Sequence, residues 1–283
     1  MKITHYLHDL AVFPLTLSFR PAADQIDPGR LRLLDPIVFV PGLGCHRNWF
    51  DTAFSHQALR THALLSIDLP GQGDHADDHM SRDFNRHPMD GLITILSGCV
   101  QGALELVADM NDDTRVHIVA HSMGALAALR AWQALPSHRR GRFISIEGNI
   151  TSEDCSMASR SIAKGIDAVE QFVADIAGSD DPAMRCWAVD LASCEPQFLV
   201  NLASSIVAWS DVEHNHPRGG AMRDAVYLYG ERSGFPEHHR ARFEELGVIT
   251  QGIENSGHFP MHDNADDLWN IVADAVRSYR ARY

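Results

Sequence analysis

Short runs of apolar residues alternate along the chain with longer stretches in which apolar residues recur every three or four positions. Runs such as "PIVFV", closed by the turn at Pro41-Gly42, are typical of buried strands. Runs of this kind predict strands within residues 11–19, 36–40, 63–69, 116–120, 142–147, 225–230 and 248–254. Strands that alternate with helices favour parallel pairing in a sheet whose two faces are covered. The predicted fold class is α/β, with a mostly parallel sheet of about eight strands and helices on both faces.

The strand pattern stops between Asn149 and about Gly220. Apolar residues in this stretch step along helical faces instead. These residues are Ile162, Ile166, Val169, Val173, Ile176, Trp187, Leu191, Phe198, Leu199, Leu202 and Ile206. A helical stretch of this length between two strands indicates a lid packed over the sheet rather than another strand–helix layer. We therefore expect an inserted helical cap at residues 149–219 and a core made of residues 1–148 and 220–283.

Composition and charge narrow the kinds of partner that the protein binds. The chain has 283 residues, enough for one large domain with an insertion. It carries 24 Lys and Arg against 37 Asp and Glu, a net charge of −13, which argues against a nucleic-acid surface. The start "MKITHYLHDL" has no long apolar run, and no stretch approaches the roughly 18–20 apolar residues of a membrane helix. We expect a cytoplasmic protein that binds a small molecule and neither nucleic acid nor membrane.

Cysteines and histidines give no clear metal or disulfide pattern. The five cysteines are Cys45, Cys99, Cys155, Cys186 and Cys194. Their odd number and the absence of CxxC spacing predict reduced thiols. Among the 17 histidines, the stretches "DHADDHM" (74–80) and "EHNH" (213–216) look like metal sites, but both are polar and lack a ligand framework. We expect no bound metal and no cofactor.

One serine lies between a predicted strand and a predicted helix. In "HIVAHSMGAL", Ser122 directly follows the strand, at the end of a parallel sheet where ligands bind. A sharp strand-to-helix turn would expose its hydroxyl beside the first N–H groups of the helix. Ala120 and Gly124 are small enough for strand and helix to pack closely at such a turn. Taken alone, Ser122 also fits an ordinary helix N-cap.

Three motifs together resemble the α/β-hydrolase fold. The segment "AHSMG" resembles its nucleophile elbow, G-x-S-x-G, with Ala120 in place of the first glycine. The segment "SGHFP" resembles the loop of the catalytic histidine, which implies His258 as the base; His262 is the competitor without the Gly-His setting. The turn "DLPGQGD" resembles D-x-P-G-x-G-x-S, with Asp74 at the serine position. The resemblance covers about residues 36–148 and 220–283.

The acid of the implied triad has two candidates. Members of the family most often carry it in a G-x-x-D stretch after the lid, where this chain reads "YGERSG" and has Ser233. Other members, including a branch of the haloalkane dehalogenases, carry it one strand earlier, where this chain has Glu147, 25 residues after Ser122. We predict Glu147 as the acid. Glu231 is the rival, and Glu147 could instead pair with an arginine or cap the first lid helix.

The resemblance also implies an oxyanion hole and a reaction class. The two backbone N–H groups would come from Met123 and from Leu43, which follows Pro41 and the retained Gly42 in a loop where many relatives have His-Gly. A serine rather than an aspartate nucleophile implies hydrolysis of a carboxylic ester, lactone or thioester through an acyl-enzyme. Aromatic and sulfur-containing residues would shape an apolar pocket. These candidates are Trp49, Met157, Phe172, Trp187 and Trp209.

Two other functions remain open at this stage. The same fold supports hydrolysis of carbon–carbon bonds and cofactor-independent ring-cleaving oxygenation, in which the histidine acts as base without an acyl-serine. Relatives of the oxygenase kind also carry the acid on the earlier strand. A non-catalytic small-molecule receptor is the third reading, which the complete set of serine, acid and histidine disfavours. We expect a small-molecule substrate with an apolar acyl or alcohol part, and a homodimer as one assembly state compatible with the chain.

Overall fold

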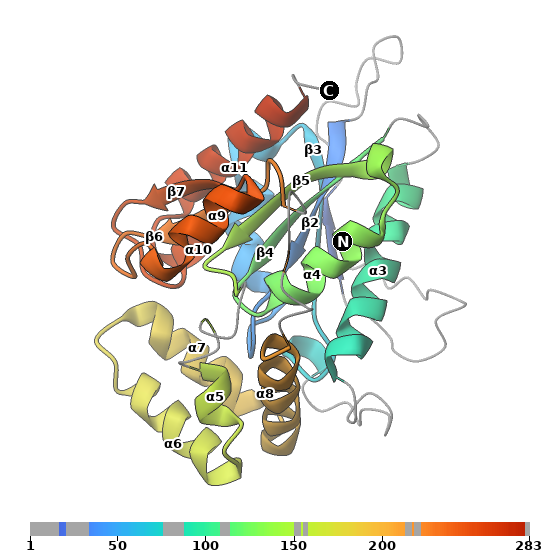
Figure 1. The fold of residues 1–283 in the computed structure, drawn as a ribbon. Coiled ribbons are helices and arrows are strands. Elements are labelled where there is room, and N and C mark those ends of the chain that lie inside the picture. The colour runs from blue at the N-terminus through green and yellow to red at the C-terminus, as the bar shows by residue number, and fades with distance from the viewer. Residues whose placement is uncertain are drawn as a thin grey trace.

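The computed structural model describes residues 17–20, 34–75, 88–107, 114–149, 154, 158–212, 217 and 222–280. In this part of the chain a seven-stranded sheet runs through the molecule in the order β1-β3-β2-β4-β5-β6-β7 (Figure 1). Its strands are β1 (Leu17–Arg20), β2 (Leu34–Val40), β3 (His62–Ile67), β4 (Val116–His121), β5 (Arg140–Ile146), β6 (Val226–Gly230) and β7 (Ile249–Ile253). Only the pair β1–β3 is antiparallel. The predicted α/β class with a mostly parallel sheet is confirmed.

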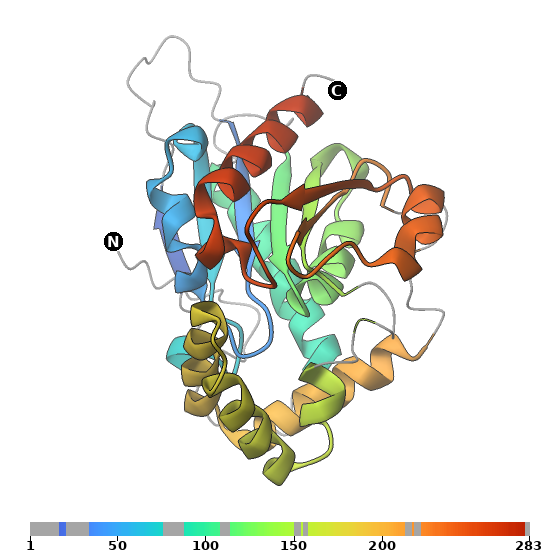
Figure 2. The same cartoon turned by 90° about the vertical axis from the view of Figure 1, so that its left-hand side faces the viewer.

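Helices cover both faces of the sheet. On one face, α3 (Pro88–Val107) packs against α4 (Gly124–Ala134), and on the other lie α1 (Asp51–Ser55) and α11 (Ala265–Arg280) (Figure 1, Figure 2). The other core helices among the described residues are α9 (Arg240–Leu246) and α10 (Pro260–Asp263). The 3₁₀ turns there are η1 (Arg47–Phe50), η2 (Gln57–Leu59), η3 (Gly73–His75), η4 (Ser137–Arg139) and η7 (Glu237–His239). None of the described helices has the length and hydropathy that crossing a bilayer requires.

The central strands are apolar on both faces because helices cover both. All six residues of β4 are buried, and Phe39 of β2 is fully buried against Phe50 and Trp269, with ring centroids 5.2 and 5.7 Å away. This double burial explains why these strands read as continuous apolar runs rather than as alternating patterns. The edge strand β7 differs, since its first three residues are exposed.

In the described part of the chain, four helices lie between β5 and β6. They are α5 (Ala158–Ile162), α6 (Ile166–Ala177), α7 (Pro182–Ser193) and α8 (Pro196–Ser210), and residues 158–212 contain no strand. These helices, called the helical insertion below, pack mainly against one another and form a group beneath the sheet in Figure 1. The start of α7 follows from its sequence, because the Asp181 carboxylate accepts the N–H of Ala183 at 2.8 Å and Pro182 occupies the first turn.

Helix α4 packs very closely against the loop that follows β2. A Cβ atom placed on Gly124 would overlap the carbonyl oxygen of Pro41 and lie 3.1 Å from Val40. Glycine at the first position of α4 therefore allows the helix to approach the sheet directly after Ser122. The close approach holds together the two segments that flank the candidate serine.

Replacement of Gly124 by alanine tests this packing. We expect Gly124→Ala to lower the free energy of unfolding by about 1–3 kcal/mol, because the added methyl group pushes α4 away from Pro41. Urea denaturation measures the effect. The matched control is Gly178→Ala, at the exposed end of α6, where a Cβ would meet its nearest neighbour at an ordinary 3.5 Å. Equal stability of the two variants would contradict the packing argument.

Candidate active site

Ser122 stands on a strained turn at the end of β4. Its φ is +50°, a backbone conformation that residues other than glycine rarely adopt. Two neighbouring segments hold the turn: the Ser122 N–H donates to Ile146 O at 2.9 Å, and Ser122 O accepts from Ala125 N at 3.0 Å and from Asn149 N at 3.3 Å. These bonds fix a conformation in which the hydroxyl leaves the plane of the sheet instead of continuing the strand.

His258 lies between Ser122 and Glu147. Its Nε2 is 3.2 Å from Ser122 Oγ, and its Nδ1 is 3.4 Å from Glu147 Oε2. The loop that carries it follows β7 and precedes α10. Side chains from the ends of three different strands thus converge at one edge of the sheet. Both distances are at the long end of the range for hydrogen bonds.

Glu147 occupies the turn directly after β5, and its backbone is also strained, with a φ of +48°. Its N–H donates to Leu228 O of β6 at 2.8 Å, and its Oε1 accepts from Gly230 N at 2.6 Å. The other carboxylate oxygen faces His258, and the side chain is only 11% exposed. Within the described ranges no arginine pairs with Glu147, so the alternative structural role of an arginine partner finds no support.

The rival residues lie elsewhere. Glu231 and Ser233 are both exposed, and the Glu231 carboxylate makes no hydrogen bond to His258 in the described part of the chain. His262 pairs with Asp263 at 3.5 Å, and its ring lies 6.4 Å from that of Trp49. The structure therefore brings Glu147, and neither Glu231 nor Ser233, to His258.

The loop after β2 lies against the serine. A Cβ on Gly42 would be 3.0 Å from Ser122 Cβ and 2.9 Å from His121 Nδ1, so only a glycine lets the backbone approach this closely. The N–H groups of Leu43 and Met123 donate to no other residue among those described. Two backbone donors thus remain available beside Ser122, the kind of group that stabilises a developing oxyanion.

The same loop is fixed from both sides. The Gly44 N–H, in a residue with a φ of +69°, donates to the Gln72 side chain of the glycine-rich turn. From the helical insertion, Trp187 Nε1 donates to Leu43 O at 2.7 Å, and Leu191 packs directly on Gly44. These contacts hold the loop between the turn "DLPGQGD" and helix α7.

The aspartate that replaces serine in that turn has an ionic partner. Arg47 is 6% exposed, pairs with the fully buried Asp68 and lies 2.9 Å from the Asp74 carboxylate. The Asp74 N–H also donates to Asp68 at 3.2 Å. Asp74 is therefore a second acidic partner of Arg47 next to the loop, and the positive charge of Arg47 explains why an acidic residue is tolerated at this position.

The predicted pocket residues divide into three groups. Trp187 of α7 lies 5.5 Å from the ring of Phe172 and 5.5 Å from Phe259, next to His258. Trp49 stacks on the other side of Phe259 at 4.7 Å. Trp209 lies apart, with the Arg130 guanidinium of α4 at 5.4 Å from its ring. Met157 falls outside the described residues.

A separate groove of about 470 Å³ lies between η1, α7 and α10. Its lining comprises His46, Asn48, Trp49, Thr52, Cys186, Val189, Asp190, Met261 and His262. Neither Ser122 nor His258 lines it. The ring of Phe259 contacts Trp49, which lines the groove, at 4.7 Å and His258 at 5.0 Å. Trp49 is held at this position by the Asp190 carboxylate, 2.6 Å from its Nε1.

His121 is a residue of the site that sequence reasoning missed. It is 2% exposed, and its Nε2 lies 2.8 Å from the carbonyl oxygen of His258, so this nitrogen carries a proton that it donates. Burial lowers the pKa of His121 well below 6.5, and the nearby His258 lowers it further. A neutral His121 thus connects the end of β4 to the loop that carries His258. Its position beside Ser122 was the only available signal, and a histidine in an apolar strand is more often a core residue.

Comparison with known proteins identifies the class. A sequence model described as "Alpha/beta hydrolase family" matches residues 37–270. The match covers most of the chain, and the protein belongs to this family. No curated protein matches the chain.

Solved structures agree in fold. The esterase from Exiguobacterium antarcticum has a TM-score of 0.65 at 12% identity, over 93% of this chain and 95% of its own. The enol-lactonase from Burkholderia xenovorans LB400 has a TM-score of 0.60 at 16% identity, over 94% and 98%. A mutant of the N-acyl homoserine lactonase AidH has a TM-score of 0.69 at 12% identity, over 99% and 98%. At these identities the likeness establishes the fold.

The neutral state of His121 predicts a pH dependence of stability. Below about pH 6.5 the unfolded chain protonates this imidazole and the folded chain does not, so the unfolded state binds more protons. The free energy of unfolding should therefore fall as the pH decreases from 7 to 5.5, by up to about 1.4 kcal/mol per pH unit from this residue. His121→Asn should show a shallower dependence in urea denaturation. His138→Asn, at an exposed position, should retain the slope of the original protein; identical slopes for all three would contradict the assignment.

Proposed function

We propose that the protein is a serine hydrolase that cleaves a carboxylic ester, lactone or thioester through an acyl-enzyme. The observation that supports this proposal is the placement of His258, with Nε2 at 3.2 Å from Ser122 Oγ and Nδ1 at 3.4 Å from Glu147 Oε2. Nucleophile, base and acid are then connected in the order that acyl transfer requires. Membership of the hydrolase family supports the general reaction class.

The proposed cycle starts at His258. The Glu147 carboxylate accepts the Nδ1 proton, which leaves the Nε2 lone pair facing the Ser122 hydroxyl. As Ser122 Oγ attacks the substrate carbonyl carbon, its proton moves to Nε2, and Glu147 stabilises the imidazolium that results. Because Gly230 N–H holds the second carboxylate oxygen at 2.6 Å, the acid keeps its orientation throughout.

The backbone N–H groups of Leu43 and Met123 are the proposed donors to the oxyanion. The tetrahedral intermediate collapses when His258 returns its proton to the leaving alcohol or thiol. Water, deprotonated by the same imidazole, then attacks the acyl carbon. The bond to Ser122 Oγ breaks as His258 returns this proton to the serine oxygen, which releases the acid and restores the hydroxyl. Removal of one donor from an oxyanion hole costs about 2.7–4 kcal/mol of transition-state stabilisation where a side-chain donor has been deleted.

The helical insertion is proposed as a lid that shapes the substrate pocket. Trp187, Phe172 and Phe259 form an aromatic group next to His258, and Trp187 is hydrogen-bonded to the loop that carries the proposed donor. An apolar acyl or alcohol part of the substrate would pack against these rings. Trp209 lies with Arg130 and is not assigned to the pocket. The solved structures that are similar in fold include an enol-lactonase and an N-acyl homoserine lactonase. Lactones are therefore the substrate class to test first.

The position of Glu147 after β5 also suits the second candidate function. A cofactor-independent oxygenase or carbon–carbon hydrolase would use His258, oriented by Glu147, as a base toward the substrate itself. In an oxygenase of this kind, Ser122 would bind the substrate and would not attack it. The two functions therefore differ in whether Ser122 forms a covalent bond.

The Ser122→Ala variant separates these functions. We expect an active-site phosphonate to form one adduct, on Ser122, as detected by mass spectrometry, and to abolish hydrolysis of nitrophenyl esters. The kcat of Ser122→Ala should be lower by a factor of about 10⁴–10⁶, because the hydroxyl is the attacking group. The exposed Ser137→Ala is the control. Full activity of Ser122→Ala would favour the base-only reaction, and a protein that turns over no ester and takes up no label would favour a receptor.

The acid is tested by a pair of conservative variants. Glu147→Gln keeps the shape of the side chain but removes the charge that stabilises the imidazolium, so kcat should fall by up to about 10⁴. Glu231→Gln changes an exposed carboxylate and should leave kcat close to that of the original protein. Steady-state kinetics with one nitrophenyl ester measures both. A larger loss in Glu231→Gln would show that the acid has been assigned to the wrong residue.

A further inference from the structure

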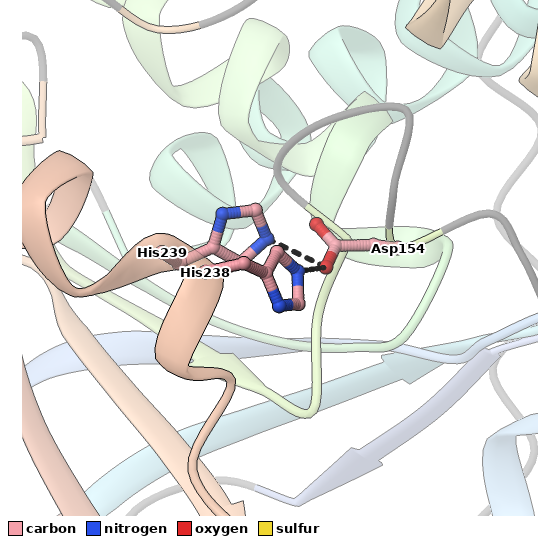
Figure 3. A group of neighbouring side chains, drawn as sticks. All are labelled: Asp154, His238 and His239. Atoms are coloured by element: carbon pink, nitrogen blue, oxygen red, sulfur yellow. Dashed lines mark hydrogen bonds and ion pairs between the residues drawn. The ribbon is translucent and has the colours of Figure 1, made fainter.

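A second cluster of chemistry-bearing side chains lies outside the candidate active site. Asp154, located between β5 and α5, meets His238 and His239 of η7 (Figure 3). These residues come from two segments on either side of the helical insertion, 85 positions apart for Asp154 and His239. It is the one group of three or more potential metal-ligating side chains in the described part of the chain.

The two imidazoles face the same oxygen. Nε2 of His239 is 2.6 Å from Asp154 Oδ1, and Nε2 of His238 is 3.5 Å from that oxygen (Figure 3). All three potential ligand atoms lie within 4.8 Å of one another. His239 is almost fully buried and Asp154 is 12% exposed in its side chain, whereas the His238 side chain is 51% exposed. The cluster is therefore fixed on one side and open on the other.

We propose that Asp154, His238 and His239 bind a divalent transition-metal ion of the zinc type. Two imidazole nitrogens and one carboxylate oxygen are a ligand set that zinc accepts, with a fourth position left for water. Tetrahedral coordination with bonds of about 2.0 Å places ligand atoms about 3.3 Å apart. The two Nε2 atoms now lie 2.6 and 3.5 Å from Asp154 Oδ1, close to this spacing. The excess of acidic residues in the chain, with a net charge of −13, adds a general attraction for cations.

The metal would take the place of a proton. With no ion bound, the hydrogen bond between His239 and Asp154 requires a proton on His239 Nε2, since the ionised carboxylate can only accept. When a cation occupies the centre of the cluster, the lone pair of each Nε2 coordinates it, and the imidazole proton resides on Nδ1. The bound metal ion would thereby replace the hydrogen bond between His239 and Asp154 with three coordinate bonds.

Such a site would connect the helical insertion to the core. Asp154 belongs to the segment that leads from β5 into α5, and η7 belongs to the core between β6 and α9. The His239 ring lies 5.5 Å from the ring of Phe243 in α9, and this contact fixes the histidine against that helix. A metal that bridges these segments stabilises the folded arrangement without contacting Ser122 or His258, so its role is separate from the proposed hydrolysis.

Metal titration of three proteins tests the proposal. The original protein, His238→Ala and the control His138→Ala are stripped of metal and titrated with Zn²⁺ against a chromophoric chelator. His238 is the residue of choice because its half-exposed side chain can be removed without opening the core, and His138 is an exposed histidine on η4. We expect one equivalent of Zn²⁺ to bind the original protein and His138→Ala equally. His238→Ala should bind at least about 10-fold more weakly.

Co²⁺ supplies a second, spectroscopic readout. Bound in a four-coordinate nitrogen and oxygen site, it should give visible absorption in the original protein and in His138→Ala, and this absorption should be lost in His238→Ala. Zn²⁺ should also raise the Tm of the first two proteins and leave that of His238→Ala unchanged. No stoichiometric uptake, or equal uptake by all three proteins, would overturn the proposal and leave the cluster as an Asp–His hydrogen bond. Neither readout depends on ester hydrolysis, so failure of the proposed function would not affect this result.

Discussion

Two strained turns at the carboxyl ends of adjacent strands determine the arrangement of the candidate site. Ser122 and Glu147 both have a positive φ, of 50° and 48°, although neither is a glycine. Each turn is stabilised by the neighbouring strand: Ser122 N–H donates to Ile146 O, and Glu147 N–H donates to Leu228 O. A conformation that costs on the order of 1–3 kcal/mol persists because the surrounding sheet over-determines it. The two side chains consequently leave the sheet at the same edge, 25 residues apart in sequence.

The loop that carries His258 is the third segment of the site, and contacts with several neighbouring residues fix its position. The His258 loop is held by the buried His121 through its backbone carbonyl, at 2.8 Å, and by the Gly257 N–H, which donates to Asp263 at 2.8 Å. A Cβ on Gly230 would overlap the backbone of this loop, so the glycine that contacts Glu147 also allows the loop to approach. One glycine thus contacts both Glu147 and the loop that carries the imidazole.

The sequence predicted the features that follow from local patterns and failed on those that depend on distant contacts. Continuous apolar runs predicted the parallel sheet, because strands covered on both faces have no polar side. Because Ser233 stands where the family most often carries the acid, the sequence favoured Glu147, which the structure places beside His258. The place of Trp209 beside Arg130 could not be foreseen, since helical periodicity does not reveal which neighbour a helix faces. The cluster at Asp154 escaped notice for the same reason: its ligands come from segments separated by the whole insertion.

The hydrogen bond from Trp187 to Leu43 has a mechanical consequence. Helix α7 cannot separate from the core unless this 2.7 Å bond breaks and Leu191 leaves Gly44. The helix that borders the aromatic group is therefore coupled to the backbone segment beside the serine hydroxyl, and a displacement of one breaks its contacts with the other. A bulky ligand that enters from the side of α7 would displace the loop that carries the Leu43 N–H, the proposed donor to its carbonyl oxygen. A ligand that enters from another side would leave helix α7 and this loop in place.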